Sequence, residues 1–147
     1  MKRLLAVLLG LLFALSAAAG DGATVVVATG TFADVKDDLV MAIEQRGLVV
    51  NFTAHVGDML ERTGRDLGKT KRIYDQADVI EFCSATASRA MLEADPQNLV
   101  YCPYTIAIYT QPGKPGVVYL AHRKFPQSAA LKPAADLLRA IIADVLK

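Results

Sequence analysis

The chain has 147 residues, of which 53% are hydrophobic and 21% are charged. This length corresponds to a single domain, and the composition excludes a disordered or polyelectrolyte protein. The formal net charge is +1, and without Lys2 and Arg3 the chain has 14 basic against 15 acidic residues, a net charge of −1. Because nucleic-acid-binding domains carry a clear excess of basic residues, we expect no nucleic-acid partner.

The N-terminus has the three parts of an export signal. Lys2 and Arg3 precede an apolar run over residues 4–15, and small residues follow at 17–19. This order is typical of a Sec-type signal peptide. A membrane span needs about 20 apolar residues, so the short run favours cleavage over an uncleaved anchor. We expect a cleaved signal peptide over 1–19, one domain over 20–147, and a periplasmic or secreted protein whose mature form has no membrane partner.

The first half of the mature chain predicts two strands around a helix. Residues 24–28 are β-rich and bounded by glycines, which indicates a short strand. Thr31 and Asp34 form a capping signal for a helix that Gly47 ends. Residues 48–56 alternate between apolar and polar side chains, which predicts a strand with Val50 and Phe52 on the same face.

Residues 57–77 form a long excursion with three glycines, many charges and scattered apolar residues. Asp58 and Glu61 can cap one short helix, and residues 69–74 are compatible with another. Long excursions within small domains often serve as lids or binding loops. A solvated insertion is the alternative, and the sequence leaves both open.

The second half predicts three strands and two helices. Strands are expected at 78–83, 100–110 and 117–123, with a turn over 111–116 joining the last two. Ser84 can cap a helix over 85–94, and an amphipathic helix is expected over 132–147. The whole pattern predicts a two-layer α/β (α+β) domain with about five strands, about three main helices and a mixed or mostly antiparallel sheet.

Two cysteines, Cys83 and Cys102, occur in a chain that we expect to be exported. Cysteines in an oxidising compartment pair by default. A helix between two strands usually makes the strands parallel, which would separate these cysteines along the sheet. Bridged Cα atoms must lie within about 7 Å. A disulfide, two separate buried thiols and a functional thiol therefore all remain open.

The functional-thiol hypothesis rests on Cys83 followed six residues later by Arg89, at a predicted strand end. This spacing resembles the phosphate loop of cysteine phosphatases and rhodanese-type sulfurtransferases. A helix N-terminus lowers a thiol pKa and binds anions, and an arginine can clamp an oxyanion. On this hypothesis Cys83 and Arg89 are catalytic, and Ser84 and Ser88 bind the ligand. The simpler interpretation is a core cysteine and a solvated arginine.

Histidines supply a further candidate set. His55 and Asp58 stand at the start of the excursion, and with Cys102 they complete the predicted ligand-binding residues. The order His55, Cys83, Cys102, His122 matches no standard metal-site spacing. We therefore predict no metal and no cofactor, and keep a metal or haem accessory role as an alternative.

Several short blocks of sequence resemble the family catalogued as domain of unknown function 302, in its exported, longer-looped type. The resemblance covers roughly residues 32–123. It implies a compact α/β domain with one cysteine before the central helix and another in the following strand, and it implies no established activity. The blocks are His55-Val56-Gly57-Asp58-Met59-Leu60, Glu81-Phe82-Cys83-Ser84-Ala85, Ser88-Arg89, Glu93-Ala94-Asp95-Pro96 and Cys102-Pro103-Tyr104.

The leading hypothesis is an exported accessory protein that binds a small ligand or a periplasmic partner without catalysis. Its expected surface is the segment 83–89, covered by residues 57–77. The alternative is a thiol-dependent enzyme or carrier that uses Cys83 and Arg89 on sulfur or phosphorus oxyanions. Because exposed sheet edges invite pairing, a homodimer is one expected assembly.

Overall fold

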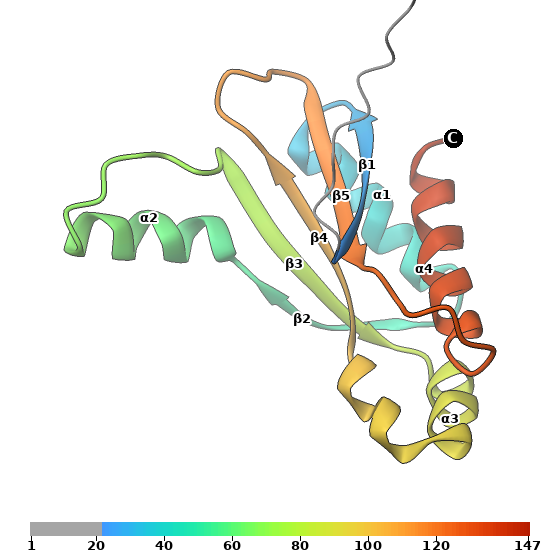
Figure 1. Ribbon diagram of the computed structural model, residues 1–147. Helices are drawn as coiled ribbons and strands as arrows, with labels where there is room; N and C mark the ends of the chain where they lie inside the picture. The colour runs from blue at the N-terminus through green and yellow to red at the C-terminus, as the bar shows by residue number, and fades with distance from the viewer. Residues whose placement is uncertain (1–21) are drawn as a thin grey trace, which may run out of the picture.

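The computed structural model describes residues 22–147, so the predicted signal peptide lies outside the described residues. Strands and helices alternate along most of the chain (Figure 1). They are β1 (Ala23–Thr29), α1 (Phe32–Glu44), β2 (Val49–Ala54), α2 (Val56–Asp66), β3 (Gln76–Cys83), α3 (Ala85–Ala94), the 3-10 helix η1 (Pro96–Tyr101), β4 (Tyr104–Thr110), β5 (Val117–Arg123) and α4 (Lys132–Val145).

The five strands form one sheet in the order β1-β5-β4-β3-β2. Every neighbouring pair is antiparallel. The α+β class and the mostly antiparallel sheet predicted from the sequence are thus confirmed. Within residues 22–147, no helix combines the length and the apolar character that a membrane span requires.

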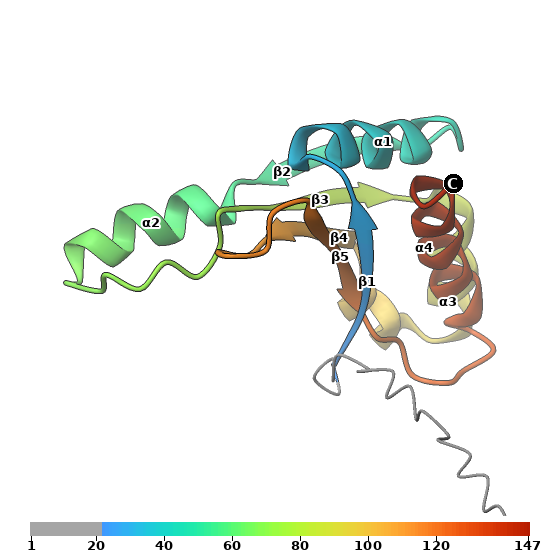
Figure 2. The ribbon, with the colours of Figure 1, turned by 90° about the horizontal axis from the view of Figure 1, so that it is seen from above.

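The core lies between the sheet and the helices α1 and α4. These helices pack against each other and against the same side of the sheet (Figure 2). Each large apolar side chain buried there contributes about 1.5–3 kcal/mol relative to exposure, so this layer is the main source of stability. The fully buried side chains include Leu39, Ile43, Ile80, Phe82, Ile106, Leu120, Leu138 and Ile141.

The other side of the sheet, called the open face below, is largely half-exposed. Along β4 the side chains alternate, with Ile106 and Ile108 buried and Ala107 and Tyr109 half-exposed. The open face also has apolar side chains from the other strands, and none of them belongs to the core cluster. Its apolar residues are Val25, Val27, Phe52, Ala54, Ala77, Val79, Ala107, Tyr109, Tyr119 and Ala121.

Two predicted helix starts are confirmed by their hydrogen bonds. The Thr31 hydroxyl accepts from the backbone N–H of Asp34 at 3.1 Å and begins α1. The Ser84 hydroxyl accepts from the backbone N–H of Ala87 at 3.3 Å and begins α3. Each side chain satisfies one of the backbone donors that a helix N-terminus leaves free.

The face predicted for Phe52 is wrong. Val50 pairs with the buried Phe82, whereas Phe52 pairs with Glu81, so Asn51 is an extra residue in β2. Such a bulge shifts the alternation by one residue. Phe52 therefore lies on the open face with 60% of its surface exposed.

The strand predicted over 100–110 is too long, and its expected direction is wrong. Pro96 starts η1, which the Asp95 carboxylate caps by accepting from the N–H of Gln97 at 2.9 Å. The strand β4 begins only at Tyr104 and runs antiparallel to β3. Figure 1 shows the reason: α3 and η1 stay at one end of the sheet instead of crossing its face.

The excursion forms a single helix and an extended return. Asp58 lies in the first turn of α2 instead of capping it, and residues 69–74 form no helix, contrary to the sequence-based expectation. Gly68, with φ +65°, takes the left-handed conformation that follows the end of α2. The helix extends away from the rest of the domain (Figures 1 and 2), and none of its residues is buried.

Candidate functional site

The two cysteines lie at the same end of the sheet. Phe82 pairs with Tyr104, so the end of β3 lies beside the start of β4. Cys83 ends β3, and Cys102 and Pro103 come directly before β4. The separation that we expected from parallel strands is therefore wrong. Both cysteines are free thiols in the structure; Cys83 is exposed and Cys102 is half-buried against the core.

Cys102 belongs to a polar network between α3 and β4. Its thiol donates to the Ser88 hydroxyl at 3.3 Å, and that hydroxyl donates to the Tyr104 hydroxyl at 3.1 Å. Tyr104 is 1% exposed, and burial raises the pKa of its hydroxyl. Because buried polar groups need hydrogen-bond partners, the network satisfies Tyr104. The structure thus gives Ser88 and Cys102 packing partners within the fold.

The surroundings of the Cys83 thiol favour its protonated form. Partial desolvation raises its pKa, and the neighbouring Cys102 thiol and Glu81 carboxylate raise it further. The backbone N–H of Tyr104 donates to the sulfur and opposes this shift in pKa. Because the thiolate is the nucleophilic form, a raised pKa disfavours nucleophilic chemistry near neutral pH.

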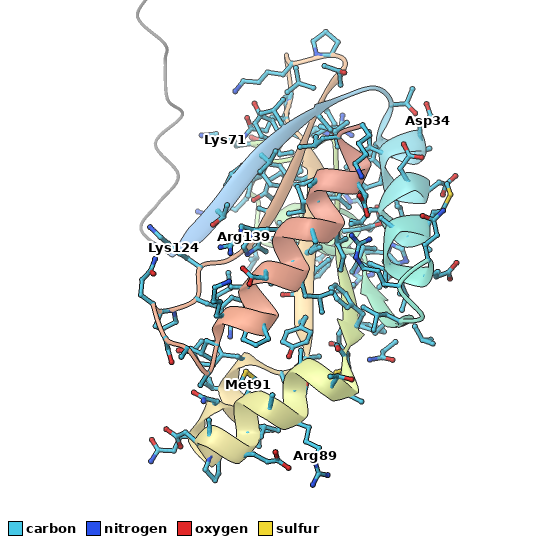
Figure 3. The ribbon with its side chains drawn as sticks, turned by 90° about the vertical axis from the view of Figure 1, so that its right-hand side faces the viewer. Asp34, Lys71, Arg89, Met91, Lys124 and Arg139 are labelled. Atoms are coloured by element: carbon cyan, nitrogen blue, oxygen red, sulfur yellow. The ribbon has the colours of Figure 1, made fainter. Side chains whose placement is uncertain are left out.

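Arg89 points away from the domain into solvent (Figure 3). Its side chain is 81% exposed, and its Nε lies 2.7 Å from the carboxylate of Glu93, one turn further along α3. Ser84 is engaged as the cap of the same helix. The structure therefore does not bring Arg89 and Cys83 together around an anion-binding loop.

At the other end of β3, His55 contacts a carboxylate that sequence reasoning missed. Its Nδ1 lies 2.8 Å from Asp78 Oδ1, and Lys36 Nζ donates to Asp78 Oδ2 at 2.6 Å. Asp78 is only 7% exposed, and a buried carboxylate needs such partners. The available signal was an aspartate in a strand with otherwise apolar neighbours. The trio connects α1, β3 and the start of α2.

A cavity of about 550 Å³ lies between α2 and the returning segment 68–74. Two glycines of the lining let backbone segments approach closely: a side-chain carbon at Gly57 would stand 2.9 Å from the backbone N of Ala77, and one at Gly64 would stand 3.1 Å from the carbonyl oxygen of Lys69. The cavity is lined by Gly57, Leu60, Glu61, Gly64, Arg65, Gly68, Lys69, Thr70, Lys71, Arg72, Ile73 and Tyr74.

The cavity lining combines positive charge with apolar surface. Arg65 pairs with Glu61 at 3.1 Å, and Arg72 pairs with Asp75 at 3.3 Å. Among residues 22–147, Lys69 and Lys71 have no carboxylate partner within ion-pair distance. Apolar surface comes from Leu60, Ile73 and Tyr74. This lining fits an organic anion.

The excursion does not cover the segment 83–89, contrary to our expectation. It joins the end of β2 to the start of β3, whereas Cys83 lies at the opposite end of β3. With eight residues, that strand separates its two ends by about 23 Å. The ring centroids of Tyr74 and Tyr109 lie 5.2 Å apart, so the return of the excursion contacts the open face instead.

His122 is buried and lies on β5, apart from the excursion. Its Nδ1–H donates to the carbonyl of Arg123 at 2.8 Å, and burial lowers its pKa. In the part of the chain that the structure describes, no three histidine, cysteine or acidic side chains gather closely enough to hold a metal ion. The structure does not bring His55, Cys83, Cys102 and His122 together as a ligand set.

Comparisons with known proteins give a family but no activity. The family model described as "Domain of unknown function DUF302" matches residues 23–147. The crystal structure of an uncharacterized conserved DUF302 protein from Bacillus stearothermophilus is similar, with a TM-score of 0.63 and 16% identity over 84% of this chain and 94% of that one. No curated protein matches the chain. The family model spans nearly the whole described chain, and the protein therefore belongs to the DUF302 family.

Proposed function

We propose that this protein is an exported, non-catalytic binding protein that holds a small organic anion in the cavity between α2 and residues 68–74. The observation that carries the proposal is the cavity itself, about 550 Å³ in volume with both apolar and cationic lining. Sites for small molecules typically measure about 300–1,000 Å³ and combine apolar walls with a few polar groups. The cavity meets both conditions.

Several apolar residues of the excursion remain exposed to solvent. None of the α2 residues is buried, and Met59, Leu67 and Ile73 are 41%, 72% and 53% exposed. A helix of 11 residues is marginal in water without tertiary packing, since isolated helices need about 12–15 residues. A ligand with an apolar body would supply part of the missing core.

The charges of the cavity select the sign of the ligand. Lys69 and Lys71 are exposed and stand on the returning segment, while the two arginines of the lining, Arg65 and Arg72, already have carboxylate partners. An anionic group on the ligand would therefore meet two available ammonium groups. A neutral ligand of the same shape would leave them unpaired and bind less tightly.

Export is the second part of the proposal, and it is supported by the sequence of residues 1–19. The intact mass of the protein recovered from the periplasm of an expressing bacterium tests it. Cleavage after Ala19 predicts a chain beginning at Gly20. A chain that keeps residue 1 and fractionates with membranes would contradict export as a cleaved protein.

The binding proposal is tested with anilinonaphthalene sulfonate, an anion with an apolar body, titrated into the full chain by calorimetry. We expect one site per chain and tighter binding than for the neutral N-phenylnaphthylamine. The double variant Lys69→Gln/Lys71→Gln should bind about tenfold less tightly, since each exposed charge contact is worth up to about 1 kcal/mol.

A matched control removes two lysines elsewhere. Lys124 and Lys147 are also exposed and do not line the cavity, so Lys124→Gln/Lys147→Gln should leave the affinity within about twofold. Equal losses in the two double variants, or equal affinity for the neutral probe, would contradict a cationic binding site at the excursion.

A further inference from the structure

The open face is an apolar surface that the described helices leave largely uncovered. Its side chains come from all five strands, and Val27 and Phe52 are 50% and 60% exposed. The core cluster occupies the opposite side of the sheet, beneath α1 and α4 (Figure 2). A contiguous apolar patch of this kind on a folded domain marks an interaction surface.

The layout of the sheet favours a second copy of the chain as the partner. The strand β4 is the middle strand of the five. A two-fold axis that runs parallel to β4 between the two open faces would therefore place β5 of each copy over β3 of the other. Such a symmetric interface needs a surface that is complementary to itself.

Charge on the open face has this self-complementarity. Glu81 on β3 is paired with Thr105 on β4, and the register of β4 with β5 places Arg123 at the same level on the other side. The axis along β4 would bring Arg123 of each copy over Glu81 of the other. Among the described residues, Glu81 has no ion-pair partner.

Arg123 is available for this contact. It is exposed, and its Nη1 donates to the carbonyl of Val100 at 2.9 Å. A guanidinium has five N–H donors, so this bond leaves donors for a carboxylate. Both ion pairs would form at once because the symmetry repeats them.

The sizes of two apolar side chains are complementary in the same arrangement. Ala121 on β5 and Val79 on β3 are both at the level of Ala107 on β4. The axis along β4 would place Val79 of each copy over Ala121 of the other, a larger side chain over a smaller one, as close packing requires. Ala77, at the next level of β3, is already buried within its own chain and takes no part.

We propose that two copies of this chain pack open face to open face about a two-fold axis parallel to β4. Five strands about 4.8 Å apart and seven residues long give a flat area of roughly 550 Å². Side-chain relief raises this area toward the roughly 800 Å² per partner of a standard interface. Face-to-face sheets cross at about 30°, so the axis lies about 15° from the direction of each β4, and residues next to the axis are displaced least.

Charge reversal tests this pairing by sedimentation equilibrium of the full chain. The wild type should have the mass of a dimer at micromolar concentration. Arg123→Glu and Glu81→Arg each place like charges over one another, and each should raise the dimer dissociation constant at least tenfold. The double variant Arg123→Glu/Glu81→Arg restores opposite charges and should return the constant to within about threefold of the wild type.

Two further variants keep the test independent of folding. Ala107→Glu places two carboxylates near the axis and should give a monomer, whereas Arg139→Glu on the exposed side of α4 should leave the dimer unchanged. Thermal melts confirm that each variant is folded. A monomeric wild type at every concentration, or a dimer that the single reversals leave intact, or a double variant as weak as the singles, would overturn the proposal.

Discussion

Asp78 is a buried carboxylate that joins two helices to the sheet through its partners Lys36 and His55. Its carboxylate is buried and accepts from Lys36 while it contacts His55, so the base of α2 is connected to α1 through one side chain. The sequence alone presents it as one of 15 acidic residues. Its burial appears only once β3 is placed in the sheet, which is why sequence reasoning selected His55 and missed its partner.

Asp78→Asn should lower the free energy of unfolding by about 1–3 kcal/mol, because Lys36 loses a charged hydrogen-bond partner. Urea unfolding measures this loss. The matched control is Asp75→Asn. The Asp75 carboxylate forms an exposed pair with Arg72, so this substitution should lower the free energy of unfolding by no more than about 0.5 kcal/mol. Equal effects of the two substitutions would show that the buried trio adds nothing to stability.

Cys83 should behave as an ordinary, unactivated thiol. Desolvation, Cys102 and Glu81 all raise its pKa, so its alkylation by iodoacetamide should reach half its maximal rate above the usual thiol pKa of about 8.5. Glu81→Gln removes one cause and should move this midpoint to lower pH. Full reactivity already below about pH 7 would contradict this expectation and support the thiol-enzyme alternative.

The buried imidazole of His122 should make the folded protein less stable in mild acid. Burial lowers its pKa in the folded protein, so below its unfolded pKa of about 6.5 the unfolded chain binds the proton first. The free energy of unfolding should therefore fall as the pH drops through and below about 6.5, and level off below the folded pKa. In His122→Asn this part of the pH dependence should vanish, which urea unfolding at a series of pH values measures.

At the scale of elements, the features that depend on neighbouring residues were predictable. The caps at Thr31 and Ser84 and the hairpin of β4 with β5 follow from short stretches of sequence. The bulge at Asn51 was not predictable, because the pairing of β2 with β3 decides it. The direction of β4 depends on where α3 packs, and no local pattern records that.

The candidate site was predictable only in outline. The glycines and charges of residues 57–77 identified the excursion as a binding loop or a solvated insertion, and the structure adds a cavity to that segment. The spacing of Cys83 and Arg89 suggested an anion loop, but the rotation of α3 directs Arg89 toward Glu93. A sequence spacing does not fix the direction in which a helical side chain points.

Gly57 controls how α2 joins the sheet. Because an added side-chain carbon would stand 2.9 Å from the backbone N of Ala77, Gly57→Ala must displace the helix and should cost about 1–3 kcal/mol. Chemical unfolding measures the cost. Thr86→Ala, at the equivalent second position of α3 and exposed, should change stability by less than about 0.5 kcal/mol. A Gly57→Ala variant as stable as this control would contradict the close approach.

At the scale of the whole molecule, the two sides of one sheet differ in how far they are buried. One side builds the core with α1 and α4, and the open face remains available for a second copy of the chain. The excursion extends beyond the sheet (Figure 1) and carries a cavity that is distant from both cysteines. The proposed ligand site and the core that stabilises the domain therefore lie in separate parts of the chain.

The location of ligand binding is the most direct test of this account. Anilinonaphthalene sulfonate is titrated into the isotope-labelled full chain, and the backbone amide shifts are mapped by nuclear magnetic resonance. We predict that the largest changes fall within residues 57–74 and saturate at one probe per chain. Changes centred on residues 83–89, or spread over the open face alone, would contradict the assignment of the ligand site to the excursion.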